Sequence, residues 1–221
     1  TRVDVAVPSG NFGNIYAGHL ARSMGVPIRR LILATNENNV LDEFFRTGVY
    51  APRPSEATLV TSSPSMDISK ASNLERFIWA LLGPEVFMQR WAELETTGTL
   101  DLRDQLPRLR EEFGFVAGTS SHADRLETIR SVKKRSGSLI DPHTADGVTV
   151  ALRVMEPGFP TLVMETAKAA KFPQTVAEAL GSEPETPDVV ADLLARPQKV
   201  ETIDNEEAPL RTLIEERALS R

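Results

Sequence analysis

The opening of the chain is the part of the sequence that most constrains its fold. Residues 3–7 form a short β-rich run, and residues 28–33 form a second apolar run. Between them, a turn at residues 8–14 leads into apolar side chains at helical spacing over residues 15–24, and Gly25 closes that pattern. Strand, helix and strand in this order predict a βαβ unit, and therefore an α/β fold with a parallel sheet flanked by helices. Ligands of such sheets bind beyond the carboxyl ends of the strands.

Helical patterns dominate the middle and the end of the chain. The segment of about residues 73–134 is helix-rich, and its predicted helices cover residues 74–82, 84–94, 103–113 and 121–134. The rhythm of the parallel sheet then resumes with a helix at residues 144–155, which Thr144 could cap, and a buried strand at residues 161–165. Three further helices are predicted near prolines, at residues 173–180, 187–195 and 209–218.

Charge and cysteine content exclude several classes of function. The formal net charge is −6 and the positive residues are scattered, so we expect neither nucleic acid nor an anionic membrane as a partner. The apolar runs are far too short to span a bilayer, and no signal peptide is recognisable. The sequence holds 0 cysteines, which excludes disulfides and thiolate chemistry and fits a cytoplasmic location.

The beginning of the chain suggests a fragment. It opens at Thr1 without an initiator methionine and enters the first predicted strand at once. We therefore expect the rest of the protein to cover sheet edges that this piece leaves exposed, because open edges promote aggregation.

The turn Ser9-Gly10-Asn11-Phe12-Gly13-Asn14 lies between a strand and a helix N-terminus. Unpaired backbone N–H groups and the helix dipole both favour an anion at such a place, and glycine and asparagine tolerate left-handed backbone angles there. The turn lacks the Lys-Ser/Thr ending of a nucleotide P-loop and the glycine spacing of a dinucleotide site, so it suits a single phosphate group. The spacing of the glycines alone leaves a turn without a ligand equally open.

The string from Val7 to Asn14 resembles the phosphate-binding loop of threonine synthases, which are pyridoxal phosphate (PLP) enzymes of fold type II, like tryptophan synthase β. Four more stretches resemble that family in the same order: residues 34–41, residues 64–68 with 72–76, residues 141–145, and residues 165–167 with 170–172. The similarity covers most of residues 3–172 and is weaker at residues 84–134 and beyond residue 180.

The resemblance implies a set of cofactor-binding residues. It assigns the PLP phosphate, largely through backbone N–H groups, to Gly10, Asn11, Phe12, Gly13 and Asn14. It also implies that the hydroxyl of Thr166 hydrogen-bonds the pyridine nitrogen of the cofactor. The family usually has a proline where this chain reads residues 167–170, so the shape of that loop departs from the pattern. Without the resemblance, Thr166 reads as an ordinary residue at the end of a strand.

Lysine and histidine residues carry the remaining expectations. PLP enzymes hold the cofactor through a lysine amine, and none of the six lysines has the Ser-Phe-Lys-Asp type of context that the family implies: Lys70, Lys133, Lys134, Lys168, Lys171, Lys199. We assign no catalytic residue to this chain. No two histidines have metal-ligand spacing, so we expect no metal site. His19 and His122 read as solvated or packed, whereas Asn36, Asp141 and His143 are weaker candidates to line the site.

The resemblance thus implies a function for the complete protein. Residues 1–172 would be the C-terminal part of the PLP-binding α/β domain, and residues 173–221 a helical tail. With the missing N-terminal half, the enzyme would convert O-phospho-L-homoserine and water to L-threonine and phosphate in the cytoplasm, and this chain alone would be inactive. Two alternatives stay open: another fold type II PLP lyase, such as a phospholyase or dehydratase, and a non-catalytic anion-binding module.

Overall fold

The computed structural model describes residues 2–188, 192–193 and 195–218. It divides into two compact units, Thr1–Glu185 and Thr186–Arg221. In the second unit, the helix α9 (Glu207–Ala218) agrees with the helix predicted at residues 209–218. The helix predicted at residues 187–195 includes positions that lie outside the described residues.

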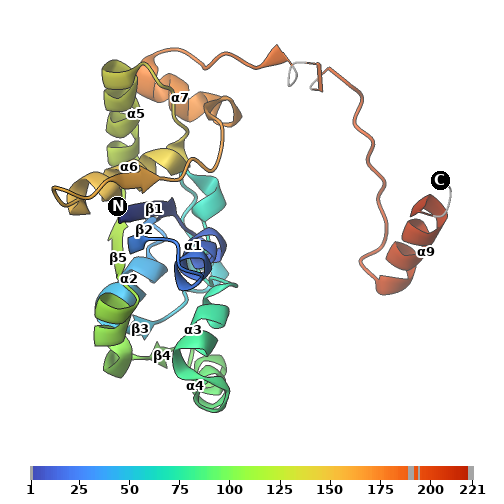
Figure 1. Cartoon of the computed structure of the whole chain (residues 1–221). Helices are drawn as coiled ribbons and strands as arrows, with labels where there is room; N and C mark the ends of the chain where they lie inside the picture. Colours follow the sequence, from blue (N-terminus) through green and yellow to red (C-terminus); the bar gives the residue numbers. More distant parts are fainter. Residues whose placement is uncertain (1, 189–191, 194, 219–221) are drawn as a thin grey trace. The chain divides into compact units, whose positions relative to one another are not determined.

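A four-stranded parallel sheet forms the centre of the first unit, in the order β5-β2-β1-β6 (Figure 1). The strands are β1 (Val3–Pro8), β2 (Ile28–Thr35), β5 (Phe115–Thr119) and β6 (Thr161–Val163). The helix α1 (Gly13–Ser23) connects β1 to β2 and completes the predicted βαβ unit. The predicted fold class, an α/β fold with a parallel sheet flanked by helices, is therefore confirmed.

Two helical layers cover the sheet, and the side chains of the strands alternate between them. One face, with Val7 and Leu33, packs under α1 and α2 (Val40–Thr47). The other face, with Ala6 and Ile32, packs against α6 (Pro142–Val154), which contacts all four strands. The remaining helices of the unit are α3 (Leu74–Leu82), α4 (Pro84–Thr97), α5 (His122–Ser136) and α7 (Pro173–Leu180). A small antiparallel pair joins β3 (Val49–Tyr50) to β4 (Leu100–Asp101).

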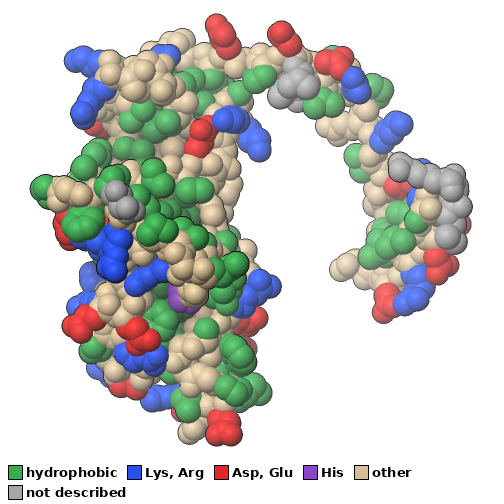
Figure 2. All heavy atoms as spheres, viewed as in Figure 1, with side chains coloured by type: hydrophobic (Ala, Val, Ile, Leu, Met, Phe, Trp, Pro, Cys, Tyr) green, Lys and Arg blue, Asp and Glu red, His purple; other side chains and the backbone are tan. Residues whose placement is uncertain are grey.

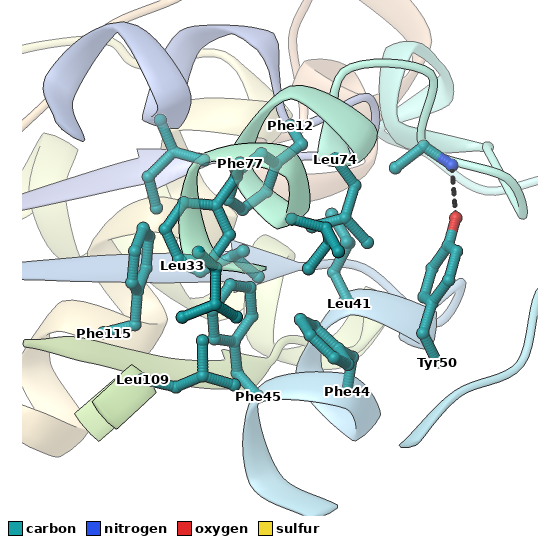
Figure 3. Close-up of a cluster of buried hydrophobic side chains, with 14 of the residues drawn as sticks. Phe12, Leu33, Leu41, Phe44, Phe45, Tyr50, Leu74, Phe77, Leu109 and Phe115 are labelled. Carbon is teal, nitrogen blue, oxygen red and sulfur yellow. Dashed lines mark hydrogen bonds between the residues drawn. The ribbon is translucent and has the colours of Figure 1, made fainter. Parts of the chain in front are cut away.

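The larger core is rich in aromatic rings and lies on the α1 side of the sheet (Figure 3). Phe12, Phe45, Phe77 and Phe115 are all buried there, and their ring centroids lie 4.6 to 6.2 Å apart. At its edge the hydroxyl of Tyr50 accepts a hydrogen bond from the backbone N–H of Ala71 at 2.9 Å. This core supports the underside of the turn that follows β1.

One fully buried arginine ties together the loops at the carboxyl edge of the sheet. Arg125, on α5, donates to Glu37 at 2.9 Å and to Asp146 at 3.1 Å. Glu37 follows β2, and Asp146 belongs to α6. Since the buried guanidinium pairs with carboxylates from two other segments, it links the segment after β2 to α5 and α6.

The surface shows mixed charge on the face drawn in Figure 2, where Lys and Arg side chains are interspersed with Asp and Glu side chains. No helix in the described part of the chain is both long enough and apolar enough to cross a membrane.

The structure corrects three of the expectations about helices and strands and refines a fourth. Residues 103–112 are helical without a break, as predicted, but the helix is irregular: it begins as a 3₁₀ turn at Arg103–Gln105, and it ends as a π-helical turn at Arg108–Glu112. The strand β5 lies within the segment that was read as helix-rich.

The other two corrections concern α6 and β6. The helix α6 begins at Pro142, and its cap is Asp141, which accepts from the N–H groups of His143 and Thr144; Thr144 is not the cap. The last strand, β6, is three residues long and lies at the edge of the sheet, where the side chain of Leu162 is 53% exposed, so this strand is not buried.

Candidate functional site

A cavity of about 280 Å³ opens beyond the carboxyl ends of β1 and β6. Every residue to which the resemblance assigned the cofactor lines it: Gly10, Asn11, Phe12, Gly13, Asn14, Thr166. The rest of its lining consists of Pro8, Ser9, Ser65, Met66, His143 and Ala167. Parallel strands explain this convergence, because the loops after β1 and β6 leave the same edge of the sheet.

The residues 9–14, called here the phosphate loop, present unpaired backbone donors. Ser9 still extends the sheet, since its N–H donates to the carbonyl of Ala34 at 2.8 Å. Among the described residues, no hydrogen bond uses the backbone N–H of residues 10–15 as donor. No side chain caps α1, and its first turn carries no acidic residue. The helix dipole and these free N–H groups therefore both favour an anion at this position.

The expectation that Gly10 and Gly13 take left-handed angles is wrong. The residue with positive φ is Phe12, at φ 67°, which is the N-cap of α1. Gly10 is required for a different reason: a Cβ added there would lie 2.7 Å from the Cα of Met66. A Cβ at Gly13 would meet only the side-chain nitrogen of Asn73, at 3.2 Å. Gly10 thus permits a close approach of two backbones, while Gly13 is under milder restraint.

Phe12 holds its rare conformation because its ring is anchored in the aromatic core. The ring is 1% exposed and stacks on Phe45 at 5.7 Å between centroids. A non-glycine residue with positive φ costs of order 1 kcal/mol, which burial of an aromatic side chain readily offsets. The side chain of Phe12 therefore fixes the loop from below, and its backbone forms part of the cavity wall.

The two asparagines of the loop behave differently. Asn11 is tied to the start of α3, because its side-chain oxygen accepts from Ser72 and from Asn73, each at 2.7 Å. Its carbonyl also accepts from the backbone N–H of Asn73 at 3.2 Å. Asn14 is exposed at the second position of α1. The side chain of Asn11 therefore mainly stabilises the loop. Of the two asparagines, only Asn14 has a side-chain amide without a protein partner among the described residues.

Thr166 lies across the cavity from the phosphate loop, in the segment that follows β6. It is exposed, and no described residue is hydrogen-bonded to its hydroxyl. A phosphate beside the free N–H groups and a ring nitrogen beside Thr166 would use the donors that the protein itself leaves unpaired. The residues present therefore fit a phosphorylated heteroaromatic cofactor such as PLP.

Asp141 and His143 form a buried pair on the cavity wall. His143 is 2% exposed and lines the cavity, and its Nδ1 lies 2.9 Å from Oδ1 of Asp141. Burial alone would raise the pKa of Asp141, but hydrogen bonds from His143 and Thr144 outweigh burial and hold that pKa below its usual range. Of these two candidates, His143 lines the cavity, and Asp141 orients the imidazole of His143.

Asn36 does not reach the cavity. It belongs to a group of buried and half-buried side chains, called here the polar cluster, which comprises Asn36, Asn38, Thr61, Ser63 and Asp67. Asn36 donates to Oδ1 of Asp67 at 2.8 Å and to the hydroxyl of Thr61 at 2.9 Å. The cluster fixes the loop of residues 61–67, which carries Ser65 and Met66 to the cavity.

Ser65 and Met66 also line the cavity, although no sequence pattern predicted a role for either residue. They belong to the 3₁₀ turn Pro64–Met66, labelled η2. The stretch around Pro64 was noted only as similar to the family, and the available signal was its proline at the first position of a turn.

The remaining titratable residues lie outside the site. No lysine of the described chain lines the cavity. His19 is packed among aromatic rings, where burial and then Arg22 lower its pKa. His122 bridges Ser62 and Glu178, at 2.8 and 2.9 Å. Within the described residues no group of three His, Cys, Asp or Glu side chains is arranged to hold a metal ion.

Known proteins with similar sequences agree with this description of the site. Residues 144–214 match the family model "Threonine synthase, C-terminal". The chain is 50% identical to the threonine synthase of Methylobacillus glycogenes over 218 residues, which are 97% of this chain and 46% of that protein. It is 51% identical to that of Corynebacterium glutamicum, over 93% of this chain and 44% of that protein.

A solved structure agrees with these sequence matches. The crystal structure of PLP-bound threonine synthase from Brucella melitensis superimposes with a TM-score of 0.85 at 36% identity, over 98% of this chain and 46% of that chain. The present chain thus spans about half the length of the relatives it matches.

Proposed function

Because the chain is a homologue of threonine synthases over about half of their length, we propose that it forms the part of such an enzyme that binds the phosphate and the ring nitrogen of PLP. The complete enzyme would convert O-phospho-L-homoserine and water to L-threonine and phosphate. The N-terminal half would supply the lysine that this chain does not place at the site.

One observation carries the proposal: unpaired donors from two segments that are far apart in the sequence line a single cavity. The free backbone N–H groups of residues 10–14 lie at and just before the start of α1, and the unpaired hydroxyl of Thr166 follows β6. Backbone donors at a helix N-terminus suit a phosphate dianion, while a neutral hydroxyl suits a pyridine nitrogen. Neither set of donors forms a hydrogen bond to any part of the chain that the structure describes.

The residues of this chain act mainly by binding and orientation. When bound, PLP supplies an electron sink for carbanion chemistry at the amino acid. The phosphate loop fixes one end of the cofactor, and Thr166 fixes the ring without a full negative charge beside its nitrogen. The buried core under Phe12 keeps water away from the back of the phosphate loop, which strengthens the hydrogen bonds on its other side.

Two further statements remain predictions. We assign residues 1–172 to the PLP-binding α/β domain and residues 173–221 to a helical tail, and we place the complete enzyme in the cytoplasm, a location with which the 0 cysteines of this sequence are consistent.

The test begins with the chain alone. We expect no threonine from O-phospho-L-homoserine, no Schiff-base absorbance band with PLP and no adduct that borohydride can trap, because no lysine of the described chain lines the cavity. A stoichiometric, catalytically competent adduct on any lysine would contradict the proposal.

The same assays on the complete protein should give both the absorbance band and threonine. Equal phosphate release from O-phospho-L-threonine would instead indicate a phospholyase. If the complete protein binds no PLP, the chain is a non-catalytic anion-binding module.

A further inference from the structure

The turn at Ser65 and Met66 forms the wall of the cavity beside the phosphate loop. It is held by a hydrogen bond to a residue that is far away in the sequence. The turn η2 has an early N–H group, that of Ser65, which the turn itself cannot satisfy. This N–H donates to Nε2 of His143 at 3.0 Å, across a sequence separation of 78 residues. His143 therefore caps a turn that belongs to a different part of the chain.

This bond defines the protonation of the imidazole. Since Nε2 accepts from Ser65, its proton must be on Nδ1, which then donates to Oδ1 of Asp141 at 2.9 Å. Asp141 is fully buried and is itself fixed as the cap of α6. The ring of Phe172 packs beside the imidazole, with centroids 4.8 Å apart. The neutral ring is thus held from both of its nitrogens.

The held turn is in direct contact with the phosphate loop. Met66 follows Ser65, and its Cα would lie only 2.7 Å from a Cβ added at Gly10. The two backbones therefore touch with no side chain between them. A shift of Ser65 carries Met66 with it, and Gly10 must move in response because interiors this closely packed do not absorb the change.

We propose that Asp141 and His143 are positioning residues that set the phosphate loop by holding Ser65. Neither needs to touch the phosphate: His143 supplies an acceptor at Nε2, and Asp141 fixes the tautomer that makes it one. The part that concerns PLP rests on the proposed function, whereas the coupling from His143 to Gly10 does not.

The first experiment needs no ligand. Amide hydrogen exchange and amide chemical shifts are measured by NMR on the chain and on three variants. His143→Leu and His143→Asn lack an acceptor that reaches Ser65, so we expect exchange at Ser65 to rise about tenfold, as for the loss of one hydrogen bond, and the Gly10 amide shift to move. His143→Gln places an oxygen where Nε2 was and should restore both readouts.

Two outcomes of this experiment overturn the proposal: unchanged Ser65 exchange in both His143→Leu and His143→Asn, or faster exchange with an unmoved Gly10 amide. If His143→Leu does not fold, His143→Asn decides, because it keeps a polar amide beside Asp141.

The second experiment measures affinity for PLP and for pyridoxal, which lacks the phosphate, in the complete protein. His143→Leu should weaken PLP binding about tenfold, weaken pyridoxal binding clearly less, and be rescued by His143→Gln to within about threefold. Equal losses for both ligands would overturn the positioning role. If neither ligand binds the wild-type protein, the proposed function fails, while the NMR experiment still decides the coupling.

Discussion

The phosphate loop lines the cavity, and the polar cluster fixes the segment that carries Ser65 and Met66 to the same cavity. The two regions use their hydrogen-bonding groups in opposite ways. In the phosphate loop, the backbone N–H groups of residues 10–15 have no protein partner among the described residues, while the side chain of Phe12 is buried in aromatic core. In the polar cluster, the side chains bond one another: Asp67 alone accepts from Asn36, Asn38 and Thr61. The first region keeps its donors available, and the second uses them for its own structure.

The difference separates binding from support. Unpaired donors are tolerated in the phosphate loop because its residues line the cavity, where a ligand or solvent can satisfy them. Buried polar groups without partners would be costly in the cluster, so each must be matched. Substitutions in the two regions should therefore affect different measurements.

The largest effect is expected from Phe12→Ala. Removing a fully buried aromatic side chain should lower the free energy of unfolding by about 3–5 kcal/mol, measured by urea denaturation. Phe159→Ala is the matched control, because Phe159 is 36% exposed and contacts mainly Arg29. If both variants lose the same stability, the phosphate loop is not anchored through its ring.

Asp67→Asn tests the polar cluster. The new amide would point a donor at groups that already donate, so we expect stability to fall by about 1–3 kcal/mol. Glu111→Gln makes the same chemical change at an exposed position and should be nearly neutral. A stability change no larger than that of Glu111→Gln would show that the cluster is not needed to hold residues 61–67.

Gly10→Ala and Gly13→Ala compare two positions within the phosphate loop. The methyl group at residue 10 would strike the backbone of Met66, at 2.7 Å, and we expect a loss of about 1–3 kcal/mol in stability. At residue 13 the methyl group meets only the side chain of Asn73, at 3.2 Å, so less than about 1 kcal/mol is expected. The reverse order in thermal unfolding would contradict the close approach.

The smallest effect concerns Thr166, where stability should not change because the side chain is exposed. In the complete protein, Thr166→Val deletes the hydroxyl and should weaken PLP binding by about 1 kcal/mol in equilibrium dialysis. Turnover should fall markedly as well. Thr166→Ser keeps the hydroxyl and should retain most of the affinity, so equal losses in the two variants would point to shape rather than hydrogen bonding.

The sequence predicted the βαβ unit because residues 3–33 carry strong local signals: apolar runs, a glycine-rich turn and a closing glycine. It also predicted that Thr166 lies at the same edge of the sheet as the phosphate loop, because the carboxyl ends of parallel strands lie at one edge. Which loop residue is left-handed was not predictable, because Phe12 holds that conformation through contacts with Phe45, Phe77 and Phe115.

The parts that the sequence missed depend on long-range contacts. The strand β5 is short and has glycine at both ends of its pattern, Gly114 and Gly118, so only pairing with β2 defines it. The role of Ser65 depends on His143, which no local pattern relates to it. The position of Asp141 directly before Pro142 is typical of a helix cap, so this signal favours Asp141 over Thr144 as the cap of α6.

The place of β6 in the sheet also sets an order of events during folding. β1 pairs with β2 across a short connection, Val3 opposite Ile28, whereas β1 pairs with β6 only when Asp4 meets Thr161. Closing the longer loop costs more chain entropy, so contacts of high sequence separation form late. We therefore expect the phosphate loop to be in place before Thr166 arrives, so that the cavity is completed only in the last stage of folding.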